Sequence, residues 1–377
     1  MTEPREISLQ FLVKFRSGQD YKHVDDPAGS VPVYGSGGIF ASASDYLYDG
    51  ESVLFGRKGT IDRPAYVCGK FWTVDTMFYT ELREGVSGRW LYYWATTIPF
   101  GLYSTDTALP SMTSSVLGRI KAPLVPHVQQ CAIADYLDRE TGEIDAMLAK
   151  LNSLSEALAE RKVLVIQNLT QRSDSGVRWT AVPTAHLFSS IGSGTTPKGV
   201  HYYAESGSGI PWVTTSELRE SVIVETTQDV TEEAVGALSA LRVHPRGSVV
   251  IAMYGATIGR LAMLGVDAAM NQACCAFSSP RNVDSRFFYY ALWGQREELI
   301  LEANGGGQPN ISQGFLRRWR VPCPPLVEQR RIADHLDEVT GRIDAMLAKV
   351  AELKALLVER RAALITDVVT GRKKVPA

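Results

Sequence analysis

The sequence predicts an α+β fold in which two globular domains are each followed by a long helix, and in which the two helices pack on each other. The first observation is a repeat, because the heptapeptide IDAMLAK occurs at 144–150 and again at 343–349. The second is the spacing of apolar residues around each copy, which is typical of paired helices. The third is that Gly-rich, strand-prone sequence precedes each helical copy.

The repeat extends far beyond the heptapeptide, at a constant offset of 199 residues and without a gap. The aligned pairs include Pro126 with Pro325, Gln130 with Gln329, Asp135 with Asp334, Asp138 with Asp337 and Thr141 with Thr340. A match of this length is not chance. We therefore expect four segments: a first globular domain at 1–125, a first helical segment at 126–172, a second globular domain at 173–321, and a second helical segment with a C-terminal tail at 322–377.

The first globular domain is predicted to be mostly strand and loop. Short β-prone runs at 52–55 and 70–74 lie between Gly-rich stretches such as 34–38. The segment Arg89–Thr97 is aromatic at helical spacing. Its aromatic side chains could form core or a platform for stacking bases, and core is favoured because no basic residue follows Arg89 within the segment.

Each long helix carries a narrow apolar stripe whose members recur at steps of three and four, as in a coiled-coil seam. The predicted helix-pairing residues are Ile144, Met147, Leu151, Leu154 and Leu158 in the first helix, and Ile343, Met346, Val350, Leu353 and Leu357 in the second. Two unrelated amphipathic helices would need no common register, so pairing is favoured. Gly142 and Gly341 lie inside these helices at a cost of about 1 kcal/mol each, which suggests a shared kink or a close backbone approach.

The second globular domain resembles the first more faintly than the helices resemble each other. Ser17-Gly18 followed by Lys22 matches Ser193-Gly194 followed by Lys198. Residues 109–112 and 308–311 also correspond at the offset of 199. The two domains therefore look like one fold that carries two different surfaces.

The composition is that of a soluble globular protein, with 45% apolar and 21% charged residues among 377. No apolar run is long enough to span a membrane and no secretion signal is visible, so we expect a cytoplasmic protein. Five cysteines without a C-x-x-C pair predict neither a disulfide framework nor a zinc site. The net charge of −2 is evenly spread, which disfavours tight binding of nucleic acid by the chain alone but allows base reading beside a basic partner.

Motifs of catalysis and cofactor binding are absent from the sequence. The glycine clusters match neither a dinucleotide fingerprint nor a phosphate loop, and no G-x-S-x-G elbow is present. The only Pro-Pro pair, Pro324-Pro325, lacks the aromatic residue of an amino-methyltransferase motif. The six histidines have no metal-ligand spacing. We therefore expect no active site, no cofactor and no metal in this chain.

The second domain instead offers polar loops. Residues 193–198 and 210–216 carry hydroxyls and an ammonium on Gly/Pro-shaped loops. Amide side chains are added by Asn271, Gln272, Gln308 and Asn310; such side chains can bond adenine in a major groove but are also common in turns.

Residues 325–337 (PLVEQRRIADHLD), their looser copy at 126–138, and Gly194-Thr-Thr-Pro197 followed by Ile210-Pro-Trp212 resemble the DNA-specificity subunit of type I restriction-modification systems. The resemblance covers essentially the whole chain, although the first domain lacks the Thr-Pro and Ile-Pro-Trp motifs. It implies two pseudo-two-fold-related target-recognition domains and an antiparallel coiled coil that sets the spacer of an asymmetric bipartite DNA site. It also implies a non-catalytic subunit that holds two modification (methyltransferase) subunits, which bind S-adenosylmethionine, and through them ATP-dependent restriction subunits.

By motif matching, the resemblance places DNA contacts on both domains. The expected DNA-binding residues are Lys22, Arg57, Lys58 and Ser111 in the first domain, and Thr196, Lys198, Thr214, Tyr254, Arg260, Asn271, Gln308 and Asn310 in the second. Two alternatives stay open: a coiled-coil adaptor with two protein-binding heads and no DNA specificity, and a fused restriction-methylation enzyme.

Overall fold

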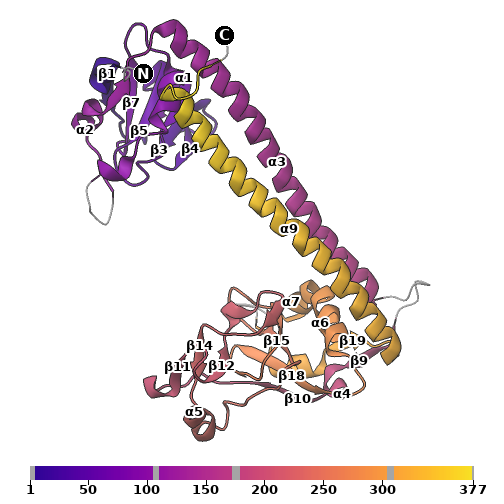
Figure 1. The fold of residues 1–377 in the computed structure, drawn as a ribbon. Coiled ribbons are helices and arrows are strands. Elements are labelled where there is room, and N and C mark those ends of the chain that lie inside the picture. Colours follow the sequence, from indigo (N-terminus) through magenta and orange to yellow (C-terminus); the bar gives the residue numbers. More distant parts are fainter. Residues whose placement is uncertain (1–4, 105–109, 172–178, 304–309, 376–377) are drawn as a thin grey trace. The chain divides into compact units, whose positions relative to one another are not determined.

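The computed structural model describes residues 5–104, 110–171, 179–303 and 310–375. It divides into two compact units, Met1–Asn152 with Ala351–Ala377 (unit 1) and Ser153–Val350 (unit 2). The predicted long helices are confirmed as α3 (His127–Gln171) and α9 (Leu326–Val369). Each unit therefore contains one globular domain and a part of both long helices (Figure 1).

Unit 1 is built on a six-stranded sheet with the order β2-β7-β5-β6-β3-β4. Neighbouring strands are antiparallel except β3 and β6, which are parallel. The strands are β2 (Val13–Ser17), β3 (Val31–Gly35), β4 (Gly38–Ala43), β5 (Tyr48–Gly56), β6 (Ala65–Thr73) and β7 (Met77–Leu82). A small pair joins β1 (Glu6–Ser8) to β8 (Lys121–Pro123), and the short helices are η1 (Leu9–Phe11), η2 (Phe100–Leu102) and α2 (Ser114–Arg119).

Helix α1 (Gly88–Ala95) places the aromatic segment of unit 1 in the core. Ser87 caps the helix by accepting a hydrogen bond from the Trp90 amide. Trp90 and Leu91 are fully buried, and Tyr93 and Trp94 are each 5% exposed. The interpretation of this segment as core is therefore confirmed, and a base-stacking platform is excluded for these side chains.

Unit 2 contains a five-stranded sheet with the order β10-β18-β15-β16-β13 and a second, four-stranded sheet with the order β11-β14-β12-β17. The strands of the first are β10 (Phe188–Ser193), β13 (Ser221–Ile223), β15 (Val249–Ala252), β16 (Leu261–Leu264) and β18 (Cys274–Pro280). Those of the second are β11 (Tyr203–Glu205), β12 (Ile210–Val213), β14 (Gln228–Val230) and β17 (Ala269–Met270). The remaining elements are β9 (Ala181–Pro183), β19 (Arg320–Pro322), α4 (Thr184–Leu187), η3 (Val200–Tyr202), η4 (Thr215–Glu217), α5 (Glu232–Ala237), α6 (Ser285–Gly294), α7 (Arg296–Ala303) and α8 (Gln313–Arg318).

The two units share a core topology. The strand order β2-β7-β5-β6-β3 of unit 1 corresponds to β10-β18-β15-β16-β13 of unit 2. In both, the first four strands are antiparallel and the fifth is parallel to its neighbour. The faint sequence echo therefore reflects one fold used twice.

In each unit the two long helices pack side by side in opposite directions. In unit 1, Ile365 and Val369 of α9 share a hydrophobic core with Ile133 and Leu137 of α3, and Arg361 donates to Asp145 at 3.0 Å. In unit 2, Ile166 of α3 shares a core with Ile332 and Leu336 of α9, and Lys162 donates to Asp344 at 2.7 Å. Within each unit, residue numbers rise on one helix as they fall on the other.

The structure corrects half of the predicted seam. Every seventh residue is buried as expected, namely Ile144, Leu151, Leu158, Ile343 and Val350, while Leu357 is half-buried. The predicted seam residues between them are exposed: the exposed fractions of Met147, Leu154, Met346 and Leu353 are 43–47%. The positions one residue later are half-buried instead, namely Leu148, Ser155, Leu347 and Lys354. Lys162 and Arg361, one heptad beyond Ser155 and Lys354, are also half-buried. On this side of the helices, Lys162 pairs with Asp344 and Arg361 pairs with Asp145.

The glycines inside the helices do not mark a close backbone approach. A Cβ built on Gly142 or Gly341 meets nothing within 4 Å, so that prediction is wrong. The threonines that precede these glycines are buried, with Thr141 and Thr340 only 3% and 5% exposed.

Within the described residues, no helix is apolar over the length that a membrane crossing requires.

Candidate nucleic-acid interface

One edge of the unit 1 sheet collects three of the predicted DNA-binding residues. The turn that follows β5 holds Arg57 and Lys58, and it forms an antiparallel bridge between Lys58 and Ser111. The Met112 amide donates to the Arg57 carbonyl at 2.9 Å, and the Gly59 amide donates to Pro110 at 3.0 Å. Residues far apart in sequence are thereby fixed side by side by backbone bonds.

Two further segments complete this edge. Gly18, at the end of β2, lies so close to the turn between β6 and β7 that a Cβ would stand 2.0 Å from the Val74 carbonyl oxygen. The Arg57 amide donates to Thr76 of the same turn at 2.8 Å. The Arg57 guanidinium stands 5.8 Å from the centre of the Phe78 ring, which holds its charge at the surface. Lys22 is exposed in the loop after Gly18.

Unit 2 repeats this arrangement with different side chains. Tyr254 bridges Asn310 as Lys58 bridges Ser111, and the Ile311 amide donates to the Met253 carbonyl at 2.8 Å. A Cβ on Gly194 would lie 1.7 Å from the Met270 carbonyl oxygen, the counterpart of the contact at Gly18. We call these equivalent surfaces, around Lys58–Ser111 and Tyr254–Asn310, the edge of each unit.

Several predicted residues of unit 2 already have local partners. Thr196 donates to Gln272 Oε1 at 2.6 Å on an exposed surface. Asn271 accepts from the Ala273 amide at 3.0 Å and is thus a turn residue. Thr214 forms a capping box with Glu217, whose carboxylate accepts from the Thr214 amide at 2.8 Å. Lys198 is exposed.

Arg260 is held by an ion-pair network rather than presented freely. Its guanidinium donates to Glu220 at 3.0 Å, and Arg296 pairs with the same carboxylate at 3.4 Å. Glu220 is 13% exposed in its side chain, so it needs this positive charge. Glu220 thus gives Arg260 a structural role, which disfavours the predicted DNA contact without testing it. Gln308 lies outside the described residues.

Two side chains at these edges were not among the predicted contacts. Gln272 holds Thr196 and is exposed; its place directly after Asn271 was a usable signal. The Ser36 hydroxyl lies 3.2 Å from where a Cβ on Gly59 would stand. No sequence signal points to Ser36, because it reaches the edge only through the return of the β3–β4 hairpin.

The chemistry behind the unit 2 edge is inert. Cys274 and Cys275 begin β18 and are fully buried. Burial raises the pKa of the Cys275 thiol to about 12, so it is neither a nucleophile nor a metal ligand at neutral pH. In the part of the chain that the structure describes, no three His, Cys, Asp or Glu side chains are grouped to hold a metal ion.

Comparison with known proteins agrees with this arrangement. The sequence profile described as "Type I restriction modification DNA specificity domain" matches residues 12–156 and 178–355. The chain is 22% identical over 275 residues to the EcoR124I/EcoR124II specificity subunit of Escherichia coli, covering 71% of this chain and 67% of that one.

Two solved structures share the fold. One, from work on complex assembly and conformational transition of the type I R-M system, covers 98% of both chains with a TM-score of 0.70 at 17% identity. The HsdS subunit from Thermoanaerobacter tengcongensis covers 99% of this chain and 98% of its own, with a TM-score of 0.53 at 16% identity. Because the profile matches most of the chain and falls on both globular domains, the chain belongs to the family of type I restriction-modification DNA specificity subunits.

Proposed function

We propose that each globular domain, 1–125 and 173–321, reads one half of an asymmetric bipartite DNA site through its edge. The observation that carries this proposal is the repeated edge, which presents Lys58 with Ser111 in one unit and Tyr254 with Asn310 in the other. A common frame with different side chains is what two different half-sites require. The edges are polar rather than strongly basic, so specificity comes from groove contacts and much of the phosphate affinity comes from partner subunits.

The proposed DNA contacts are the described residues that were expected from the sequence, without Arg260 and with Gln272 added. Lys22, Arg57 and Lys58 supply charge, and Ser111 a hydroxyl, at the first edge. At the second edge the proposed residues are Thr196, Lys198, Thr214, Tyr254, Asn271 and Asn310, to which the structure adds Gln272. Arg260 is left out because Glu220 engages it.

The long helices are proposed to dock two copies of one partner, the modification subunit. Large apolar residues are exposed at equivalent positions of both copies: Val128 and Val327 (82% and 81%), Met147 and Met346 (47% and 44%), and Leu154 and Leu353 (45% and 43%). A repeated apolar surface supports two identical partners better than one. Methyl transfer and its S-adenosylmethionine then belong to those partners, in the cytoplasm, and this chain performs no catalysis.

The experiment that tests this function is expression of the chain with its modification subunit, followed by genome-wide mapping of methylated adenine. We expect methylation at a single bipartite sequence. The chain supplied with S-adenosylmethionine alone should methylate nothing, and methyl transfer by it would instead support the fused-enzyme alternative. Methylation without sequence preference, or none with the partner bound, would favour the protein-binding adaptor.

We further propose that α3 and α9 pair along their length and set the spacer between the half-sites. Inserting seven residues after Leu151 and seven after Val350 keeps the heptad register and lengthens each helix by roughly 10 Å. At roughly 3.4 Å per base pair, the spacer should grow by about three base pairs or fewer. An unchanged spacer, or changed bases within a half-site, would show that the helices do not set the distance.

A further inference from the structure

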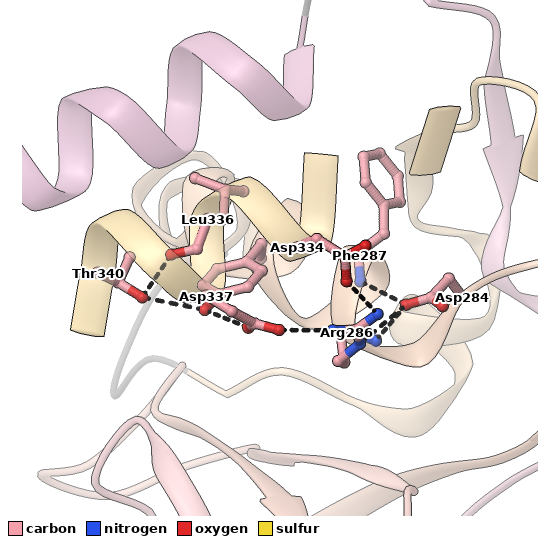
Figure 2. A network of polar contacts seen from close by, with 8 residues as sticks. Asp284, Arg286, Phe287, Asp334, Leu336, Asp337 and Thr340 are labelled. Carbon is pink, nitrogen blue, oxygen red and sulfur yellow. Dashed lines mark hydrogen bonds and ion pairs between the residues drawn. The ribbon is translucent and has the colours of Figure 1, made fainter. Parts of the chain in front are cut away.

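Unit 2 contains a polar network that ties its globular domain to its long helix (Figure 2). Arg286 of α6 bridges two carboxylates of α9, at 2.8 Å from Asp334 and 2.6 Å from Asp337. The Tyr290 hydroxyl, one turn further along α6, donates to the other oxygen of Asp337 at 2.8 Å. Tyr290 also lies 3.1 Å from the Thr340 hydroxyl, which bonds the Leu336 carbonyl at 2.7 Å.

Unit 1 contains an equivalent network between α1 and α3, except that Ser87 replaces Asp284, which lies 3.8 Å from Arg286 in unit 2. Arg89 lies 2.8 Å from Asp135 and 2.5 Å from Asp138. Tyr93 donates to Asp138 at 2.7 Å and lies 3.1 Å from Thr141. Each distance differs from its counterpart in unit 2 by no more than 0.1 Å, although the surfaces of the two domains have diverged. We call each set of Arg, two Asp, Tyr and Thr a clamp.

The Arg and the Tyr of each clamp donate to the two oxygens of one shared carboxylate. A carboxylate only accepts, so the Tyr hydroxyl must donate to Asp138 or Asp337, and the Arg fork occupies the second oxygen of that carboxylate. Tyr93 and Tyr290 are each 5% exposed. Burial raises the pKa of both phenols, which keeps the donating proton in place at any physiological pH. Such a network adds directional polar contacts to the apolar packing between the short and the long helix.

A second tie holds the N-cap of each short helix, two residues before the Arg of the clamp. The Gln130 side chain accepts from the amide of Ser87, the cap of α1, at 2.8 Å and donates to the Val125 carbonyl at 2.8 Å. Gln329 accepts from Asp284, the cap of α6, and donates to Pro324, both at 2.8 Å. Gln130 is 3% exposed and Gln329 is fully buried. The short helix is thus held to the long helix at two points, which leaves no free hinge between domain and helix.

We propose that Arg89 with Asp135 and Asp138, and Arg286 with Asp334 and Asp337, are positioning residues for DNA specificity, which fix the direction of each recognition domain on its helix and so the spacer length that the protein accepts. This inference rests on the proposed function. The clamps lie on the helices that bear the domains and not at the edges, so they act on the distance between half-sites and not on the bases within them.

The test is a set of full-length variants expressed with the modification subunit, with methylated adenines mapped genome-wide. The readout is methylation at sites with correct half-sites but a spacer one base pair longer or shorter, relative to the cognate spacer. In Arg89→Ala and in Arg286→Ala we expect this ratio to rise about fivefold, the size of coupling that single network residues carry. The double variant should exceed both, and the half-site bases should stay the same in all three.

Two further variants make the result decisive. Arg16→Ala is the matched control, because it removes an ion pair of 2.7 Å to Glu81 between β2 and β7 and leaves α3 untouched; it should keep the wild-type spacer. Arg89→Lys keeps the charge but cannot span two carboxylates as a fork, so it should give an intermediate ratio even where Arg89→Ala fails to fold.

The outcomes separate this inference from the proposed function. Wild-type spacing in the Arg89→Lys and Arg286→Ala proteins, whatever their thermal stability, would overturn the inference, as would altered bases in either half-site. A wild-type chain that directs no bipartite methylation would instead contradict the proposed function.

Discussion

The two globular domains differ in what is inserted into a common frame, not in the frame itself. Both contain five strands in the same order, with one parallel pair at the same place. Unit 2 adds a four-stranded sheet made from β11, β12, β14 and β17, each of which enters between consecutive core strands. The five shared strands and the clamp keep the same structure in both units. The inserted segments differ between the units, so the side chains at each edge can differ without a change in the common fold.

The largest expected effect lies in the shared frame. Gly194→Ala would place a Cβ 1.7 Å from the Met270 carbonyl oxygen, and Gly18→Ala would place one 2.0 Å from Val74. Each should lower the free energy of unfolding of its own unit by about 3 kcal/mol, measured by urea denaturation. Gly192→Ala is the control, because its Cβ would meet nothing within 4 Å. If one domain tolerates the change, the two edges are not built alike.

The helix seam should come next. Leu158→Ala removes a side chain that is 9% exposed and should cost about 2 kcal/mol of unfolding free energy. Leu154→Ala, four residues earlier and 45% exposed, should cost less than about 0.5 kcal/mol. Equal losses of stability in the two variants, measured by thermal denaturation, would show that Leu154 packs in the seam as first expected from the sequence. Leu154 would then not belong to an exposed docking surface.

The inserted sheet gives a domain-specific effect of similar or smaller size. Asp229 is 1% exposed and accepts bonds from Gly207 at 2.9 Å, Gly209 at 3.1 Å and Thr226 at 2.9 Å. Asp229→Ala leaves these donors unpaired and should cost about 1–3 kcal/mol, confined to the inserted sheet. Hydrogen exchange should therefore accelerate in β11 and β14 but not in β15 or β18. Acceleration throughout unit 2 would mean that the insertion is part of the core.

The smallest effect concerns thiol reactivity. Cys68 of unit 1 is exposed, whereas Cys274 and Cys275 of unit 2 are fully buried. Burial raises the pKa of Cys275 to about 12, so its thiolate is scarce from pH 7 to 9 and grows only above that range. A colorimetric thiol reagent at pH 8 should label Cys68 at once, and Cys274 and Cys275 only after unfolding. Labelling of the native pair would show that β18 opens locally.

The repeat predicted the long helices and the shared frame, because residues that pack into the core of unit 1 recur 199 positions later and pack into the core of unit 2. It did not predict which flank of each helix enters the seam, since that is decided by pairs such as Lys162 with Asp344, 182 residues apart. The structural role of Arg260 was missed for the same reason: Glu220, which pairs with it, lies 40 residues away. The edges were only half predictable, since Gly18 and Gly194 gave a signal and Ser36 gave none.

The division of the chain also has a consequence for synthesis on the ribosome. Unit 2 is one continuous stretch, Ser153–Val350, whereas unit 1 needs Ala351–Ala377 to be complete. The N-terminal domain therefore emerges first but gains Ile365, Val368 and Val369 of its core only after the whole of unit 2 has been synthesised. A chain cut short before these residues lacks the part of α9 that packs on Ile133 and Leu137. Its incomplete core should leave the truncated chain open to proteolysis.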